Sequence, residues 1–408
     1  MLAFRTRIFA AVAFPALVCL TFSSATAGAH AQSRAHVRIQ NALKAGLIAD
    51  ALALGGHYEY DAAKIRSRGG FENFQEAGKD NHGVGWGTAN YHPGKRAGDL
   101  TDAGDVAVML LRHLAQLQRS NALSAYSFDT FAAYWKSEID AGYGSCNFQT
   151  VPPNAPCPPG TKPGYINGGS RRTLQALQQQ PAAIGAHRKH LAANVNCLVA
   201  ATHFAPLFFV YSSEADLVQA AVDTVFISHN NPDPIAAAEF LARALWRIIY
   251  LNMPLQQALE QAAAQSSHEP IRAWLHSAIA KVAESLDPSS ALSRQDLVDD
   301  IAITSMARLW DVGKSEPIKV GKASPTEGAL PAALYFALKY RDNFERAIVA
   351  NANVGGDSAA RGIVIGMLLG AADGWHLPPS HRWMTGLNVM AEAESLMREL
   401  AGGSAGEL

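Results

Sequence analysis

The feature that most constrains the fold is a row of glycines in the segment 350–374, ANANVGGDSAARGIVIGMLLGAADG. Gly362, Gly366 and Gly370 recur every four residues, so they lie on one face if the segment is helical. Each interior glycine costs a helix about 1 kcal/mol relative to alanine. The pattern therefore predicts a helix that begins near Asp357 and packs very closely against the backbone of a second helix.

Asp357 and Ser358 stand where this helix would begin, directly after the glycine pair Gly355-Gly356. Two interpretations of Asp357 are open on the local sequence. The carboxylate is an N-cap that accepts hydrogen bonds from free backbone N–H groups, or it is an acidic ligand held at a rigid helix terminus inside the core. The other polar clusters of the chain bear on this choice.

Periodicity along the remaining chain predicts an all-α fold. The chain has 408 residues, of which 49% are hydrophobic, and this is enough to bury a large core. A net charge of −1 and the lack of a basic stripe exclude a nucleic-acid-binding protein. We predict one helical domain over 35–395 and a frayed tail at 396–408. Helical patterns cover 37–54, 105–119, 127–141, 167–179, 217–227, 235–250, 254–265, 268–286, 294–309, 328–339 and 343–351, with a buried helix over 189–213 that contains Pro206.

The N-terminus is typical of a secretory signal peptide. Arg5 and Arg7 precede an apolar run over 8–22, and small-residue cleavage sites follow up to Ala31. We predict that residues 1–31 are removed and that the protein is exported, either to a periplasm or to the medium. A membrane anchor is the alternative, but a run of about 15 apolar residues is shorter than the roughly 20 needed to span a bilayer.

The cysteines agree with export. Cys146 and Cys157 flank a proline-rich loop, and in an exported protein this pair predicts a disulfide. Cys197 lies in an apolar segment and is interpreted as a buried thiol rather than a nucleophile.

Four polar clusters interrupt the alanine-rich helical background, and three of them precede a predicted helix. Each cluster alone is typical of an N-cap, but together they could converge at one end of a helical bundle. The clusters are Asp50 with His57, Glu59 and Asp61; Asp99 with Thr101, Asp102 and Asp105; Ser228 to Asn231; and Asp357 with Ser358.

Carboxylate and hydroxyl oxygens suit Mg²⁺, Mn²⁺ or Ca²⁺ rather than zinc. Thr101, Asp102, Asp357 and Ser358 are therefore candidate metal ligands. A zinc site at His187 and His190, three residues apart, is the rival interpretation. We favour a solvated basic helix face for that pair, because no acidic partner has a fixed spacing to it.

Four motifs, in this order, resemble the ADP-ribosylglycohydrolase family: GLIADALALGGHYEYD, AGDLTDAGDVAVMLL, ISHNNPDPIAAAEFLARAL and NVGGDSAARGIVIGMLLGAADG. The resemblance covers about residues 38–390. YINGGSRRTL and VGKASPTEGALPAALYFAL are similar to the branch that includes the selenoprotein J and jellyfish J1-crystallin relatives. The resemblance implies an all-α, orthogonal multi-helix bundle. It also implies two Mg²⁺ ions in a central cleft, which bind ADP-ribose hydroxyls and position a water that attacks the anomeric carbon.

Carried over residue by residue, the resemblance assigns metal binding to Thr101, Asp102 and Asp357, with Ser358 in place of a threonine. Ala103 and Ala359 stand where the family has carboxylates, and His57 stands where it has a glutamate. Because two adjacent dications need several negative ligands to offset their repulsion, we expect one Mg²⁺ site rather than two.

We expect an exported hydrolase that cleaves a glycosidic bond to ribose in a small-molecule or ADP-ribosylated substrate. Arg361 either pairs with Asp357 or binds an anionic substrate group. The alternative is a non-catalytic descendant that binds an ADP-ribose-like ligand or acts structurally, as the crystallin relatives do. The candidate acid/base residues are His57, Glu59 and Asp105, and the candidate substrate-binding residues are Asp50, His229, Asn230, Gly355, Gly356 and Arg361.

Overall fold

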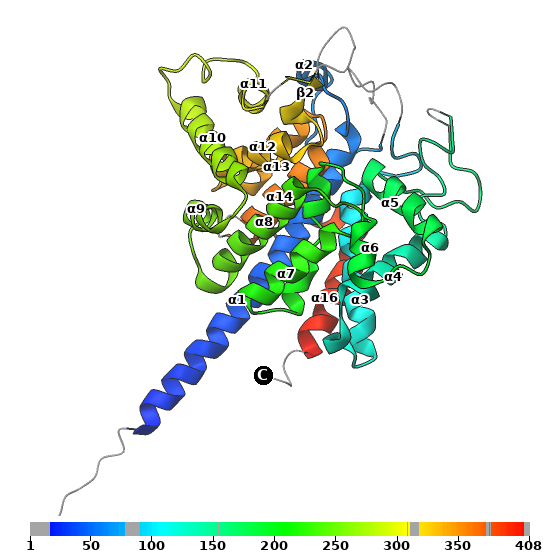
Figure 1. Ribbon diagram of the computed structural model, residues 1–408. Helices are drawn as coiled ribbons and strands as arrows, with labels where there is room; N and C mark the ends of the chain where they lie inside the picture. The colour runs from blue at the N-terminus through cyan, green and yellow to red at the C-terminus, as the bar shows by residue number, and fades with distance from the viewer. Residues whose placement is uncertain are drawn as a thin grey trace, which may run out of the picture.

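The computed structural model describes residues 17–77, 90–152, 155–307, 309–310, 318–372, 375 and 377–403. These residues form an almost entirely helical bundle, and the all-α fold class predicted from the sequence is confirmed (Figure 1). The α-helices are α1 (Leu17–Ala53), α2 (Ala62–Ser67), α3 (Asp102–Arg119), α4 (Phe128–Asp140), α5 (Gly168–Gln179), α6 (Gly185–His190), α7 (Glu214–Val225), α8 (Pro232–Leu251), α9 (Leu255–Gln265), α10 (Glu269–Leu286), α11 (Val298–Ser305), α12 (Thr326–Lys339), α13 (Phe344–Val354), α14 (Ser358–Ala371), α15 (Arg382–Gly386) and α16 (Met390–Gly403). The 3₁₀ helices are η1 (Leu54–Gly56), η2 (Leu123–Ala125), η3 (Leu198–Ala201), η4 (Ala205–Phe209) and η5 (Val320–Lys322), and β1 (Leu309–Trp310) pairs antiparallel with β2 (Ile318–Lys319).

The helix predicted from the glycine row is α14, and every one of its residues is buried. Its partner is α1. A Cβ placed on Gly362 would lie 2.9 Å from the carbonyl oxygen of Ala49, and one on Gly370 would lie 2.5 Å from that of Asn41. The row therefore allows the two helix backbones to touch, and this contact holds the start of α14 deep inside the bundle (Figure 1).

The N-terminal part of α1 extends away from the body of the bundle (Figure 1). Residues 1–16 of the predicted signal peptide lie outside the described residues, and cleavage near Ala31 stays a prediction. Among the helices that the structure describes, none is long and apolar enough to cross a membrane.

The predicted buried helix over 189–213 is wrong as a continuous element. The chain there runs from the end of α6 through η3 and η4, and only its central part, 197–208, is continuously buried. Pro206 lacks an N–H donor, so a helix through it would lose a hydrogen bond. The Asn196 side chain bonds to segments far along the chain. Its amide oxygen accepts from the Thr326 N–H at 3.0 Å, and its amide nitrogen donates to Asp233 at 2.7 Å. The helix predicted over 294–309 is likewise shorter, as α11.

Part of the tail that was predicted to fray is helical. Residues 396–403 continue α16, with Leu396, Met397 and Leu400 buried, because their spacing forms an apolar stripe. Ion pairs from Arg112 to Glu392 and from Arg119 to Glu399 tie α16 to α3. Residues 404–408 lie outside the described part of the chain.

Both predictions from the cysteines are confirmed. Cys146 and Cys157 form a disulfide with an S–S distance of 2.01 Å. Cys197 is a buried free thiol, and burial raises its pKa above the ordinary value, which keeps it protonated and unreactive.

Candidate functional site

The N-termini of α3 and α14 meet at a small buried cavity of about 20 Å³. The cavity brings together Asp102, Asp357 and His57, which come from three separate polar segments of the sequence. Its lining consists of His57, Tyr58, Asp102, Ala103, Asn167, Cys197, Val199, Asp357, Ala359 and Ala360. Three of the four predicted polar clusters therefore contribute to this cavity.

A larger cavity of about 300 Å³ lies between α2, α11 and α13. Two of its three acidic residues are already engaged, since Asp299 pairs with Lys339 at 2.7 Å and Asp300 pairs with Lys322 at 2.5 Å, and the third, Asp296, is exposed. We therefore place the candidate site at the smaller cavity, where carboxylates face the open space.

Asp357 occupies the N-cap position of α14, but its side chain makes no capping hydrogen bond. The carboxylate is 6% exposed and lines the cavity, with Oδ1 3.8 Å from His57 Nε2. The simple N-cap interpretation of this side chain is therefore wrong. The carboxylate is directed at the site.

The preceding glycines fix this geometry. Gly355 and Gly356 have φ angles of +76° and +73°, which a side chain would strain. A Cβ on either residue would also collide with a backbone carbonyl oxygen, that of Glu59 or that of Lys322. The backbones of the two glycines thus pack directly on the segment that carries His57, and the Tyr58 N–H donates to the Gly356 oxygen at 2.8 Å.

Asp102, in the first turn of α3, is the second carboxylate of the cavity. The Asn167 side chain donates to its Oδ2 at 3.0 Å, and His92 Nε2 lies 3.7 Å from its Oδ1. Burial raises the pKa of Asp102 to about 6, with the charge of Asp357 adding to the rise and the Asn167 hydrogen bond opposing it. The carboxyl can therefore exchange a proton near neutral pH.

Thr101 is the N-cap of α3, and it does not line the cavity. Its hydroxyl donates to Asp50 Oδ1 at 2.6 Å and accepts from the Ala103 N–H at 3.2 Å. Asp50 is fully buried and also accepts from the Thr101 N–H at 2.7 Å. Burial raises the pKa of Asp50 to about 7. These contacts place Asp50 beneath the start of α3, where it holds the helix end, rather than at the cavity surface predicted for a substrate contact.

His57 and Tyr58 form one wall of the cavity. Burial lowers the pKa of His57 to about 4, so the imidazole is neutral at pH 7 although Asp357 opposes the shift. Tyr58 has a φ of +69°, a conformation that side chains rarely adopt, and its ring lies 4.0 Å from the His57 ring between centroids. Such strain is commonly found at functional sites.

The other two candidate acid/base residues are engaged elsewhere. Glu59 is buried in an ion pair with Lys64 and accepts from the Asp61 N–H at 3.0 Å. Asp105 pairs with Lys95 at 2.6 Å and accepts from the Tyr143 hydroxyl at 2.8 Å. Neither lines the cavity, so the geometry favours His57 among the three.

Arg361 was predicted to pair with Asp357 or to bind substrate. Its described hydrogen bonds go to other groups, but the charge of Asp357 opposes the lowering of its pKa to about 10 by burial, so the two side chains interact electrostatically. The residue is fully buried. Its guanidinium donates to the carbonyl oxygens of Lys322 at 3.3 Å and Gly355 at 2.5 Å, and to the Asn351 side chain at 2.9 Å. Arg361 therefore clamps the loop before Asp357. Ser358 is also fully buried and outside the cavity lining, and its hydroxyl has no hydrogen-bond partner among the described residues.

The third polar cluster lies apart from the cavity. His229 is fully buried, with Nδ1 2.8 Å from the Ser228 hydroxyl and its Nε2 side packed on Gly169. Asn230 donates its backbone N–H to the Ala193 oxygen at 2.7 Å. The following helix, α8, begins at Pro232, before the start predicted at residue 235, and Asn231 caps it. Neither His229 nor Asn230 lines the cavity.

Sequence reasoning missed three residues at the site: Tyr58, His92 and Asn167. His92 lies in the glycine-rich stretch 66–98 of the sequence, and the length of that stretch without a helical pattern was a signal of function. Asn167 caps α5 with its carbonyl oxygen and contacts Asp102 with its amide. The motif YINGGS contains it, but nothing in the local sequence indicates a partner 65 residues away.

The donor set fits one hard cation better than two. Asp102 and Asp357 offer carboxylate oxygens to the cavity, while Ala103 and Ala359 line it with methyl groups. Across the part of the chain that the structure describes, no three His, Cys, Asp or Glu side chains are arranged to hold a metal ion. His187 and His190, the residues of the alternative zinc site, therefore have no third ligand of these types beside them. Two carboxylates with substrate and water oxygens suffice for a single Mg²⁺, but not for an adjacent pair.

Comparison with known proteins agrees with this architecture. The sequence model of the ADP-ribosylglycohydrolase family matches residues 31–407. A solved structure described as an ADP-ribosylglycohydrolase-related protein complex is similar in fold, with a TM-score of 0.55 and 18% sequence identity. The match covers 91% of this chain and 99% of the other. No curated protein sequence gives a significant match. On the family match, which spans nearly the whole chain, the protein belongs to the ADP-ribosylglycohydrolase family.

Proposed function

We propose that the protein is an exported hydrolase that cleaves a glycosidic bond to ribose in an ADP-ribose-like substrate, with one Mg²⁺ held by Asp102 and Asp357. Membership of the family supports a hydrolase-like function. The observation that carries the finer proposal is the convergence of Asp102, Asp357 and a neutral His57 on one buried cavity.

His57 is the proposed general base. Its neutral imidazole would accept a proton from the water that attacks the anomeric carbon, while Asp357, 3.8 Å away, would stabilise the imidazolium that forms. Asp102, held by Asn167, would bind the metal in its ionised form, and the imidazolium of His57 would return the proton that it has taken to the leaving group. A bound Mg²⁺ would offset carboxylate charge and fix substrate hydroxyl groups.

The test is release of ADP-ribose from peptides carrying ADP-ribosylated arginine or serine. Wild type should turn over one of them, and Asp357→Asn and His57→Gln should each lower kcat at least about 100-fold if they serve the chemistry. Calorimetry with Mg²⁺ alone should show binding that Asp357→Asn abolishes. Wild-type protein that binds no Mg²⁺ would rule out the metal-assisted form of the proposal.

A second candidate is a non-catalytic protein that binds an ADP-ribose-like ligand or acts structurally. Two observations favour it: Ala103 and Ala359 replace carboxylates, and a cavity of about 20 Å³ has room for about one water. Binding of ADP-ribose without turnover of either peptide would favour this candidate over the hydrolase.

Export forms part of the proposal and has its own test. The disulfide supports it, because such bonds persist in oxidising compartments. N-terminal sequencing of the protein recovered from its native host should begin near residue 32. An intact Met1 in the folded cellular protein would overturn export by cleavage.

A further inference from the structure

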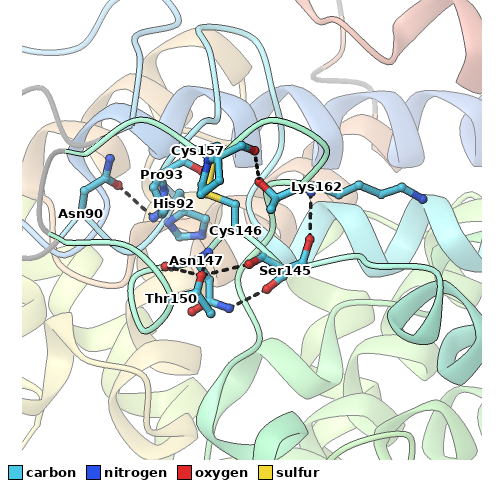
Figure 2. Close-up of a disulfide and its surroundings, with 12 residues drawn as sticks. Asn90, His92, Pro93, Ser145, Cys146, Asn147, Thr150, Cys157 and Lys162 are labelled. Atoms are coloured by element: carbon cyan, nitrogen blue, oxygen red, sulfur yellow. Dashed lines mark hydrogen bonds between the residues drawn. A yellow bond between two sulfur atoms is a disulfide. The ribbon is translucent and has the colours of Figure 1, made fainter.

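The Cys146–Cys157 disulfide lies directly against the segment that carries His92 (Figure 2). The Cys157 sulfur is 3.4 Å from the carbonyl oxygen of Pro93. Gly94, with a φ of +80°, has no room for a Cβ, because the Cys157 sulfur occupies that position. The backbone after His92 therefore packs directly against the disulfide.

Cys146 ties the disulfide to a second segment. Its N–H donates to the Lys162 oxygen at 3.1 Å, and the Gly164 N–H donates to the Cys146 oxygen at 3.2 Å. These bonds form a short parallel bridge between Cys146 and Pro163. They align the chain that continues to Tyr165 and Asn167, so the two segments that leave the disulfide have a common anchor.

Aromatic rings connect the two segments to each other and to Tyr58. The Tyr91 ring lies 4.6 Å from the Phe148 ring and 4.6 Å from the Tyr58 ring between centroids. The Tyr165 ring lies 5.4 Å from the His92 ring and 5.6 Å from the Phe148 ring. Phe148 lies inside the loop that the disulfide closes, and Tyr58 lines the cavity. The rings thus connect the disulfide loop to the cavity wall.

Both segments end on the same carboxylate. His92 approaches Asp102 Oδ1 at 3.7 Å from one segment, and Asn167 donates to Asp102 Oδ2 at 3.0 Å from the other. His92 is 1% exposed. Asn167 therefore hydrogen-bonds to Asp102, His92 packs beside the same carboxylate without a hydrogen bond, and the backbones of both residues share one disulfide anchor.

We propose that the Cys146–Cys157 disulfide is a positioning element of the candidate site, which holds His92 and Asn167 on Asp102 and keeps the aromatic rings over the cavity. Breaking the bond releases the segment at 91–94 and exposes His92, while the helical core stays folded. The inference deepens the proposed function because it concerns the same cavity. Its test, however, does not require turnover.

The experiment measures acylation of histidine rings by diethylpyrocarbonate, followed residue by residue with mass spectrometry. Oxidised protein is compared with protein whose disulfide has been reduced to two thiols by a phosphine, which is itself oxidised and then removed. His203, which is 3% exposed and lies among the buried helical residues, serves as the control for an intact core. His276, which is exposed, serves as the control for reagent activity.

We expect the acylation rate of His92 to rise at least about tenfold on reduction, with His203 protected in both states. The double variant Cys146→Ser/Cys157→Ser should behave like the reduced protein. Unchanged protection of His92 in either form would overturn the proposal. Parallel deprotection of His203 would also overturn it, because the disulfide would then stabilise the whole fold and not this site.

Measuring turnover in both redox states distinguishes a failure of this inference from a failure of the proposed function. If wild type hydrolyses an ADP-ribosylated peptide, reduction should lower kcat or raise KM in step with His92 exposure. If neither redox state shows turnover while His92 still becomes reactive on reduction, the hydrolase proposal fails and the positioning role stands.

Discussion

Asp357 and Asp61 both occupy the N-cap position of a helix, but only the carboxylate of Asp61 makes a capping hydrogen bond. Asp61 accepts from the Lys64 N–H at 2.9 Å, whereas Asp357 makes no capping bond and faces the cavity. Asp61→Ala should lower the free energy of unfolding by about 1 kcal/mol. Asp357→Ala should lower it by less, or raise it, because a buried carboxylate is removed. Urea unfolding of both variants measures this, and an equal loss would mean that Asp357 is a structural cap.

Thr101 gives a second prediction at the scale of single residues. Its buried hydroxyl donates to Asp50 at 2.6 Å, so Thr101→Val leaves a fully buried carboxyl short of a partner. The free energy of unfolding should fall by about 2 kcal/mol. Thr385→Val is the matched control, since that hydroxyl is exposed and its bonds are 3.3 Å or longer; it should change stability by less than about 0.5 kcal/mol. Equal small effects would show that the Asp50–Thr101 bond does not support α3.

At the scale of elements, the contact between α1 and α14 rests on the absence of side chains. A Cβ on Gly366 would collide with the Ala45 carbonyl oxygen and lie 2.5 Å from the Ala45 carbonyl carbon. Gly366→Ala should therefore lower the free energy of unfolding by about 1–3 kcal/mol, despite the better helix propensity of alanine. Gly402→Ala in α16, where a Cβ meets nothing within 4 Å, should be neutral or slightly stabilising. A neutral Gly366→Ala would contradict the close packing of the two helices.

The same contact shows what the sequence could predict. A glycine row is a local pattern with a local steric reason, so both the helix and its close partner were predictable. The path of segment 189–213 was not predictable, because it depends on hydrogen bonds from Asn196 to residues far along the chain. Asn167 and His92 were missed for the same reason: each reaches Asp102 through a fold-level contact. The hydrogen bonds of Arg361 were not predictable, because two of its partners are backbone carbonyl oxygens, which no sequence pattern indicates.

At the scale of the whole molecule, the buried histidines and the buried aspartates have opposite effects on how stability depends on pH. Burial lowers the pKa of His57 and His229 to about 4 and of His92 and His203 to about 3, while it raises the pKa of Asp50 to about 7 and of Asp102 to about 6. As the pH falls below 6.5, the unfolded chain gains protons at these histidines that the folded chain does not, and stability is lost. The buried aspartates act in the other direction, since their folded forms take up protons first.

His203 isolates the histidine contribution, because it lies outside the candidate site and its pKa is lowered by burial, with neighbouring His229 adding to the shift. From pH 6 down to pH 4.5, wild-type stability should fall more steeply than that of His203→Phe, by about 1 kcal/mol per pH unit. Packing changes in the variant shift stability at every pH equally, so the slope is the readout. Urea unfolding at four pH values measures it, with the exposed His276→Gln as the control that keeps the wild-type slope. Equal slopes in wild type and His203→Phe would show that His203 binds protons equally in the folded and the unfolded protein, so that burial does not lower its pKa.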